Sequence, residues 1–347
     1  MTEQKYVLGI DTSNYRTSVA LVSQDNIICD FRRFLDVKQG ERGLRQSDAL
    51  FQHVKNLPDL FEQVNDEFHG GIHAVAYSSK PRPVEGSYMP CFLAGEMAAR
   101  SIGSMLNVPV ISFSHQEGHM QSIKSYSEMS YIDEFLACHF SGGTCEILKV
   151  NTKDVEPEKD LIYDGYQLIG GENFFYDIEC IGGSKDISFG QVIDRAGVLM
   201  GYAFPAGQEL DDIAMKTGGS TNMLTPITVQ NVEFNLSGID TQIKNKINSM
   251  SKGKPVSLME DRLKHEIIRE IFDKIAVCIS KVLLQASNKT GIKDIIMSGG
   301  VSSSRYIRRQ VSEEMEKEDI IVYFDESDLA TDNGIGIALL GGKFIWD

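Results

Sequence analysis

The chain has 347 residues, of which 42% are hydrophobic and 24% charged, and its formal net charge is −15. This composition suits a globular protein with two lobes, and no apolar run reaches the roughly 18 residues of a membrane span. An acidic surface repels phosphate backbones, so nucleic-acid binding would need a local basic patch or a basic partner subunit. Six scattered cysteines without a CxxC pair, and no basic leader before an apolar stretch, favour a cytoplasmic protein with reduced thiols.

The first third of the chain alternates strands and helices. Apolar runs and helical spacing predict strands over 6–10, 18–22, 74–77 and 108–114, and helices over 47–65 and 91–106. This succession favours an α/β lobe with a mixed sheet.

Two histidines, His115 and His119, follow the last of these strands in the segment HQEGH. Histidines four residues apart share one face of a helix, so both imidazoles can reach one metal ion. A pair at this spacing is as often surface decoration or helix packing, and no glutamate occupies the HExxH position of a zinc peptidase. The pair indicates a metal site only together with other features.

The second half restarts with a strand over 134–140, a turn over 141–144 and a strand over 145–150. The same order over 6–22 indicates a duplicated two-lobe architecture. Later elements are a long helix over 263–286 that ends before Gly291, a strand over 294–297, a turn over 298–304, a helix from 305 and a strand over 320–323. We divide the chain into an N-terminal lobe over 1–114 and a C-terminal lobe over 115–347. The second lobe carries a largely helical insertion at about 185–290.

Three turns rich in Ser, Thr and Gly follow apolar strands, over 11–17, 141–144 and 298–304. Phosphate oxygens need several backbone N–H groups, and only small residues let a backbone approach them closely. Each turn alone is more often an ordinary turn, but three at corresponding places favour nucleotide binding. The residues expected to line the nucleotide in these turns are Ser13, Ser141, Gly142, Gly143, Gly299 and Gly300.

Asp332 precedes an apolar segment that reads as a helix. It can be the N-cap of that helix, or a third, anionic metal ligand that joins the two histidines. Spacing alone favours the cap.

These motifs together resemble the TsaD/Gcp family, once called O-sialoglycoprotein endopeptidases. The resemblance runs over nearly the whole chain, from Leu8-Gly-Ile-Asp-Thr-Ser13 through Ser298-Gly-Gly-Val-Ser302 to Thr331-Asp-Asn-Gly334. It implies a two-lobed actin-like (ASKHA) ATPase fold with duplicated mixed-sheet lobes. It also implies transfer of threonylcarbamoyl to a tRNA adenosine within a multi-subunit assembly.

The resemblance also assigns the metal ligands. HQEGH is similar to the family's HxEGH motif, and Asp332 falls in its TDN motif, which implies that His115, His119 and Asp332 hold one divalent ion. This overturns the cap interpretation of Asp332. The sequence does not distinguish iron, zinc and magnesium.

On the nucleotide side, Ser141-Gly-Gly143 is similar to the family's SGG phosphate loop. Asp194 matches the aspartate of its GExxDK motif, and Gly207 lies in a segment similar to the PGG that follows. Ser304 stands where the family has a nucleoside-side asparagine. The implied ligand is ATP or an acyl-adenylate.

The first turn departs from the family pattern ETSCDET, because two acidic positions are Tyr15 and Arg16 here. Arginine cannot act as a general base or a cation ligand in place of a carboxylate. We therefore expect altered acceptor-side chemistry, with Asp11 and Arg16 as the catalytic residues of this turn. The other departures are Lys80-Pro-Arg-Pro83 for the family's GPG stretch, Gln191, Arg195, Asp240 and Ser304.

The leading hypothesis is a nucleotide- and metal-binding threonylcarbamoyl- or carbamoyl-transferase that works with protein partner subunits. The expected activity is related to the synthesis of threonylcarbamoyladenosine in tRNA, with altered acceptor-side residues. The acceptor itself stays open: tRNA is one candidate, and the net charge does not favour it. The alternative is a catalytically degenerate, ATP-binding scaffold or regulatory partner of a transferase complex. Peptidase activity is disfavoured because the histidine pair lacks a neighbouring general base.

Overall fold

The fold is known from a computed structural model that describes residues 4–13, 15–37, 44–153, 165–170, 175–219, 221–251, 256, 259–324 and 334–346. The predicted ligand Asp332 lies outside these described residues. All six cysteines lie within them, and none forms a disulfide. None of the described helices is long and apolar enough to cross a bilayer.

The first sheet is built on an N-terminal antiparallel hairpin, to which parallel strands are added. Its order is β3-β2-β1-β4-β5-β8. The strands are β1 (Tyr6–Asp11), β2 (Arg16–Ser23), β3 (Ile27–Phe34), β4 (Ala74–Lys80), β5 (Val110–Ser114) and β8 (Leu168–Ile169).

The second sheet repeats this plan, with the order β10-β11-β9-β7-β6-β12-β13. Its strands are β6 (Glu134–Phe140), β7 (Cys145–Thr152), β9 (Tyr176–Ser184), β10 (Val229–Gln230), β11 (Glu233–Phe234), β12 (Asp294–Ser298) and β13 (Ile321–Phe324). In both sheets an antiparallel pair, β1–β2 or β6–β7, is flanked by a parallel strand, β4 or β12. The prediction of an α/β fold with duplicated mixed sheets is confirmed.

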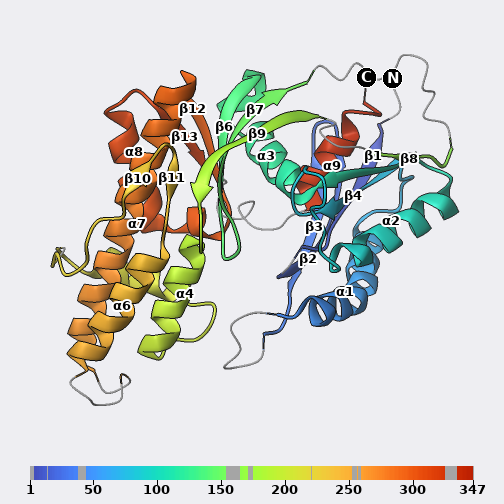
Figure 1. The fold of residues 1–347 in the computed structure, drawn as a ribbon. Helices are drawn as coiled ribbons and strands as arrows, with labels where there is room; N and C mark the ends of the chain where they lie inside the picture. Colours follow the sequence, from blue (N-terminus) through green and yellow to red (C-terminus); the bar gives the residue numbers. More distant parts are fainter. Residues whose placement is uncertain are drawn as a thin grey trace.

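The helices divide between the two sheets (Figure 1). Around the first sheet lie α1 (Gln46–Glu67), α2 (Phe92–Leu106), α3 (His115–Ser125) and α9 (Gly334–Gly342). With the second sheet lie α4 (Phe189–Met200), α5 (Gly207–Lys216), α6 (Ser237–Met250), α7 (Asp261–Thr290) and α8 (Arg305–Glu316); the short 3₁₀ helices are η1 (Glu128–Tyr131) and η3 (Gly300–Ser303). Although α9 is C-terminal, it packs against β1, β2 and β4. The division at 114/115 remains a prediction.

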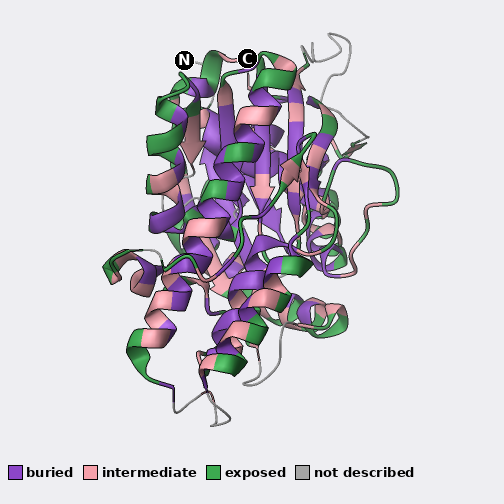
Figure 2. Cartoon of the chain, turned by 60° about the vertical axis from the view of Figure 1, so that its left-hand side comes forward, coloured by how far each residue is buried: buried purple, intermediate pink, exposed green. Residues whose placement is uncertain are grey.

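The helix α7 shows how sequence determines an element here. Buried isoleucines at helical spacing face the core, and Gly291 ends the helix in a left-handed conformation at φ +79°. The central strands β1, β2, β4, β6 and β12 are almost entirely buried, whereas the outer faces of the helices are exposed (Figure 2). The helix predicted over 263–286 is therefore confirmed, with a turn added at its C-terminal end.

Two glycines let α3 approach α9. A Cβ on Gly118 would meet the side chain of Ile337 at 2.8 Å, and one on Gly336 would meet the carbonyl oxygen of Gly118 at 1.9 Å. The backbone N–H of Gly334 donates to Ser18 Oγ at 2.8 Å, which fixes the start of α9 on β2. The glycine of HQEGH thus has a packing role that brings α3 and α9 together.

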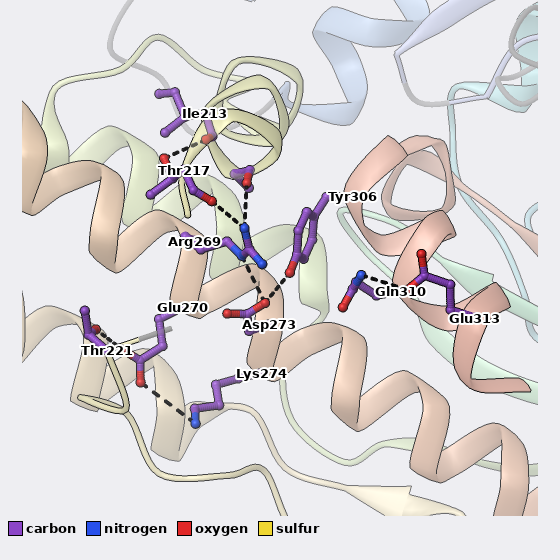
Figure 3. A network of polar contacts seen from close by, with 11 residues as sticks. Ile213, Thr217, Thr221, Arg269, Glu270, Asp273, Lys274, Tyr306, Gln310 and Glu313 are labelled. Atoms are coloured by element: carbon purple, nitrogen blue, oxygen red, sulfur yellow. Dashed lines mark hydrogen bonds and ion pairs between the residues drawn. The ribbon is translucent and has the colours of Figure 1, made fainter. Parts of the chain in front are cut away.

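A polar network ties α7 to α8 and to the end of α5 (Figure 3). Arg269 lies over the ring of Tyr306 at 4.5 Å, pairs with Asp273 at 3.1 Å and donates to the carbonyl of Thr217. The hydroxyl of Tyr306 donates to Asp273 as well. These contacts join three helices on the outside of the second sheet.

Candidate metal and nucleotide site

The helix that carries the histidine pair starts with a capping box. The backbone N–H and hydroxyl of Ser114 donate to Glu117 Oε2 at 2.8 and 2.7 Å, and Ser114 Oγ accepts from the N–H of Glu117. Burial raises the pKa of Glu117, against these hydrogen bonds and the nearby charge of Lys80. The glutamate of HQEGH therefore fixes the start of α3, and with it both histidines, at the end of β5.

The two imidazoles face each other and one of them is held by a carboxylate. His115 Nε2 and His119 Nε2 are 3.0 Å apart, and their ring planes stand at 74°. His115 Nδ1 donates to Asp11 Oδ2 at 2.7 Å. A carboxylate on the second ring nitrogen is the usual way to orient a metal-binding histidine. His119 is buried and His115 nearly so.

This donor set fits a divalent ion. Two nitrogens each about 2.1 Å from one ion and at right angles lie about 3.0 Å apart, which is the separation of the two Nε2 atoms. Imidazole ligands suit zinc, iron and related metals more than magnesium. Within the described residues, no group of three or more His, Cys, Asp or Glu side chains is arranged to hold a metal. The third expected ligand, Asp332, falls outside those residues.

Asp11 organises the end of β1. Its Oδ1 accepts from the N–H of Ser13 at 3.1 Å and from Ser78 Oγ at 2.7 Å, while its Oδ2 holds His115. Ser13 Oγ is buried, with no hydrogen-bond partner among the described residues. A buried hydroxyl of this kind is uncommon and suits a ligand-facing turn. Asp11 acts here through His115, by positioning its ring.

Arg16 is buried at the start of β2. Its guanidinium lies 3.9 Å from the ring centre of Phe34, its neighbour across the β2–β3 pair. Arg16 and Ser18 are two residues apart on the strand, so their side chains lie on the same face of the sheet. Ser18 contacts the start of α9 on that face. The structure thus places Arg16 on the α9 side of the hairpin, stacked on an aromatic ring.

The Ser141 turn lies against the first turn of α4. Ser141 Oγ accepts from the N–H groups of Gly143 and Thr144 at 3.2 and 3.0 Å. A Cβ on Gly190 of α4 would meet Ser141 O at 2.7 Å, so this glycine permits the contact. Added Cβ atoms on Gly142 and Gly143 would meet nothing within 4 Å. The turn therefore presents exposed backbone beside a helix N-terminus, where anions are favoured.

The second Ser-Gly-Gly turn meets the first across adjacent parallel strands. Gly299 has φ +92°, and a Cβ there would lie 2.5 Å from Phe140 O, at the end of β6. Ser302 Oγ donates to Ser298 O at 2.7 Å and closes the turn. A Cβ on Gly300 would meet nothing within 4 Å. The two predicted phosphate turns thus share one edge of the second sheet.

Asp194 and Gly207 come together at the start of α5. Asp194 Oδ1 accepts from the N–H of Ala206 at 2.8 Å. Burial raises the pKa of Asp194, and the backbone N–H groups of Ala206 and Gly207 oppose that rise. The carboxylate therefore caps α5, which ties this motif to the helix that follows.

Ser304 has a similar position at the start of α8. Its hydroxyl accepts from the N–H of Ile307 at 3.1 Å and donates to Asp211 of α5. Asp211 also accepts from the N–H groups of Arg305 and Tyr306 at 3.0 Å each. Sequence reasoning missed Asp211, because its partners lie more than 90 positions away.

Two of the departures from the family pattern form an ion pair. Arg195 Nη1 of α4 lies 3.2 Å from Asp240 Oδ2 of α6. The motifs that the sequence resembles have lysine at both positions. With Arg195 in place, a lysine at position 240 would put two cations side by side, whereas Asp240 pairs with the guanidinium. The two changes are electrostatically complementary, and the pair is partly exposed.

Polar contacts also cross between the two sheets. Arg82, in the segment after β4, pairs with Glu146 of β7. Gln116, the residue after His115, donates to the same carboxylate at 3.5 Å. The residue directly opposite Glu146 across the β6–β7 pair is His139, which sequence reasoning also missed. The sequence does hold a clue to His139, because it lies near the end of a predicted strand, two residues before the Ser141 turn.

The comparisons with known proteins agree over most of the chain. The family model described as TsaD, tRNA N6-adenosine threonylcarbamoyltransferase, matches residues 37–339. The chain belongs to this family. The Neorickettsia sennetsu tRNA N6-adenosine threonylcarbamoyltransferase is 27% identical over 340 residues, which cover 96% of this chain and 91% of the relative. The enzyme of the same name from Herminiimonas arsenicoxydans is 27% identical over 343 residues, covering 96% and 90%.

Solved structures show the same fold at low identity. Full-length HypF in its phosphate- and nucleotide-bound form matches with a TM-score of 0.59 and 14% identity over 99% of this chain and 47% of HypF. Component A of Acidaminococcus fermentans (R)-2-hydroxyglutaryl-CoA dehydratase matches with a TM-score of 0.52 and 14% identity over 98% of both chains. The fold is of the ASKHA type, as the family resemblance implied.

Proposed function

We propose that this protein transfers a threonylcarbamoyl or related carbamoyl group from an acyl-adenylate to an amine acceptor. The family supports a transferase of the tRNA threonylcarbamoyladenosine type. In such a transfer a C–N bond forms between the amine and the carbamoyl carbon, the C–O bond to the phosphate breaks, and AMP and one proton are released. The chain's own residues bind and orient the reacting groups.

One observation carries the proposal. The Nε2 atoms of His115 and His119 converge at 3.0 Å, and Asp11 holds the other nitrogen of His115. Two neutral imidazoles gain at most one hydrogen bond from this arrangement, whereas a shared ion engages both lone pairs. A divalent ion held by His115, His119 and Asp332 would polarise the carbamoyl oxygen or neutralise phosphate charge.

We propose that the nucleotide binds at the two Ser-Gly-Gly turns. Gly142, Gly143 and Gly300 leave open space over their backbone, and the Ser141 turn lies beside the first turn of α4. Backbone N–H groups in such turns stabilise phosphate oxygens. Asp194, Gly207 and Ser304 support this site by fixing the starts of α5 and α8.

The acceptor side is proposed to differ from the family pattern. Arg16 is a cation at a position where the motif has a carboxylate, and stacking on Phe34 holds its guanidinium in place. A guanidinium binds a carboxylate or phosphate through two hydrogen bonds, so Arg16 suits an anionic group of the acceptor. The match to the family model begins after this hairpin, at residue 37.

Partner subunits are part of the proposal. A net charge of −15 disfavours RNA binding by this chain alone, so a basic partner is expected to supply phosphate contacts. No membrane is involved in this activity.

The test is product analysis with the full chain, a divalent metal, threonylcarbamoyl-adenylate, unmodified tRNA and family partner subunits. Nucleoside mass spectrometry is expected to find threonylcarbamoyl-adenosine in the tRNA. The Herminiimonas arsenicoxydans relative serves as the positive control. Unmodified tRNA beside a working control would overturn tRNA as the acceptor.

A scaffold role is the second candidate, and one observation favours it. Asp194 and Ser304, two expected nucleotide residues, have their polar groups engaged in helix starts. A protein that keeps these residues for folding alone would retain the architecture without turnover. Such a protein would bind ATP and its partners but leave the acyl-adenylate unconsumed, with or without an acceptor.

A further inference from the structure

A cavity of about 410 Å³ lies where α3 and α9 end. Two lysines line it: Lys124 belongs to the last turn of α3, and Lys343 directly follows α9. Its volume is within the range of small-molecule sites. Lys124 comes nine residues after His115, or about 14 Å along the helix, so the cavity is separate from the histidine pair.

The first lysine is buried with little counter-charge. Lys124 is only 4% exposed, and its Nζ donates to Thr152 Oγ1 at 2.7 Å. Its one ion pair among the described residues is with Asp133 at 3.9 Å, and that carboxylate side chain is 83% exposed. Burial lowers the pKa of Lys124, and the charge of Asp133 opposes this only in part. A buried ammonium of this kind is costly unless an anion pairs with it.

The second lysine places another cation close to the first. Lys343 Nζ lies 5.1 Å from the ring centre of Phe175, and no carboxylate of a described residue is within 4 Å of it. Lys343 is exposed as a residue, but desolvation of its ammonium and the charge of Lys124 lower its pKa to about 8. The two cations are therefore close enough to repel each other, and an anion between them would relieve that repulsion.

Helix capping does not account for these positions. A cation near a helix C-terminus stabilises the helix dipole when it meets the last carbonyl groups. Here Lys124 donates to Thr152 of β7, and Lys343 extends over the ring of Phe175. Neither contact is with the end of a helix.

Aromatic rings form another part of the lining. Trp346 and Tyr126 both border the cavity. The turn after α9 brings the N–H of Trp346 to Gly342 O at 2.8 Å, and a Cβ on Gly342 would meet the indole ring at 2.2 Å. The indole N–H donates to Lys5 O at 3.2 Å. These contacts fix the ring of Trp346 at the edge of the cavity.

We infer that this cavity binds a small molecule through a phosphate group, which joins the ammonium groups of Lys124 and Lys343. Lysine binds phosphate as a point charge, whereas the planar fork of arginine suits carboxylates. The lining carries two lysines against one aspartate, the exposed Asp25, in a chain with a net charge of −15. The site is separate from the Ser-Gly-Gly turns, and it does not depend on the transferase proposal.

A single tryptophan makes the site observable. Trp346 is the only tryptophan of the chain, so its emission reports on this cavity and not on the Ser-Gly-Gly turns. The full chain is titrated with inorganic phosphate and with phenyl phosphate, at an ionic strength held constant with sodium chloride. Both are expected to change the emission saturably. Calorimetry on Gly143→Val, in which the proposed nucleotide turn is blocked, is expected to show the same phosphate binding.

Substitutions assign the binding to the two lysines. Lys124→Met and Lys343→Met keep the length of the side chain and remove its charge, and each is expected to weaken phosphate binding at least about tenfold. Lys317→Met removes a surface lysine paired with Glu314 and should bind phosphate as the wild type does. If Lys124→Met fails to fold, Lys343→Met, at an exposed position, still tests the inference.

The outcomes identify the ligand or overturn the site. Tighter binding of phenyl phosphate than of inorganic phosphate would support a phosphorylated metabolite, and equal binding would support free phosphate. Neither emission change nor heat with either compound would overturn the site, as would unchanged affinity in both lysine variants. Equal binding of acetate would overturn the phosphate assignment. A response that disappears in Gly143→Val would place the phosphate at the nucleotide turn instead. The transferase proposal is tested separately, by product analysis.

Discussion

Two polar clusters of this molecule differ in how their groups are matched. In the network of Arg269, Asp273 and Tyr306, each contact joins a donor to an acceptor or a cation to a ring (Figure 3). In the histidine pair, two ring nitrogens of the same kind converge at 3.0 Å. In the first arrangement every donor meets an acceptor or a ring, whereas the second directs two ring nitrogens of the same kind at one place.

The difference indicates which cluster serves the fold and which serves a ligand. A saturated network gains nothing from an added ion, because its donors already have acceptors. Converging imidazoles, oriented by the carboxylate of Asp11, are prepared for a metal at little cost on binding. Substitutions in the two clusters should therefore affect different quantities, ligand affinity in one and unfolding free energy in the other.

The largest effect is expected for His119→Ala. Loss of one of two imidazole ligands should lower affinity for a divalent metal by at least about 100-fold. Competition with a chromophoric chelator measures that affinity, and mass spectrometry gives the stoichiometry after dialysis. His69→Ala, at an exposed histidine, is the control and should bind metal as the wild type does. Unchanged stoichiometry in a folded His119→Ala protein would remove the pair from the metal site.

The second effect concerns the phosphate turn. Gly143→Val should lower nucleotide affinity about 30-fold, or about 2 kcal/mol, because the side chain occupies space that the phosphate needs. An added Cβ at Gly143 meets nothing within 4 Å, so folding should be unaffected. Calorimetry with ATP measures the loss, and Gly218→Val, equally open, is the control. Equal affinity in both variants would contradict the assignment of this turn.

Much of the fold could be predicted because local periodicity encodes it. In the helix around Ile271 and Ile275, apolar residues recur at helical spacing in the sequence, and Gly291 follows directly after its last residue. The strands β3 and β9 were missed, because each mixes exposed and buried residues without a long apolar run. Their position depends on pairing with β2 and β7, which no local window contains.

The candidate site was predictable only where its residues are close in sequence. His115 and His119 lie one helical turn apart, so their proximity follows from helix geometry. The ring centre of His139, on β6 of the second sheet, lies 5.4 Å from that of His119 only because the two sheets are packed together. Asp211 reaches Ser304 across 93 positions. Long-range packing of this kind requires the structure.

The third effect tests the saturated cluster. Arg269→Met keeps the length of the side chain but removes the ion pair with Asp273 and the hydrogen bond to Thr217, and should lower unfolding free energy by about 2 kcal/mol. Denaturant unfolding measures the change. Metal and nucleotide affinities should stay at wild-type values, since the contacts of the Arg269 side chain, with Ala214, Thr217, Asp273 and Tyr306, involve none of the expected metal or nucleotide residues.

A matched control lies on the same helix. Arg262 also pairs with an acidic residue four positions on, Glu266, but its side chain is 84% exposed. Arg262→Met should therefore cost less than about 0.5 kcal/mol. If both arginine variants lose the same stability, the network contributes no more than a surface ion pair and the contrast between the clusters fails.

The smallest effect is a pH dependence at Glu270, which is fully buried beside this network. Burial alone would raise its pKa, but hydrogen bonds from Thr221 and the N–H of Leu224, together with Lys274, outweigh burial and lower it. Because the folded pKa lies below the unfolded value near 4.3, the stabilisation is present above about pH 4 and lost as pH falls through the folded pKa. Glu270→Gln should cost about 1 kcal/mol at pH 7.

The pH profile distinguishes charge from packing in this variant. The stability difference between wild type and Glu270→Gln should shrink as pH falls from about 5 to 3, because the wild-type carboxyl becomes neutral as well. Urea unfolding across this range measures it, and Glu313→Gln at an exposed site should show almost no difference at any pH. A stability difference that stays constant with pH would mean that the introduced amide disturbs packing. The charge of Glu270 would then contribute nothing to stability.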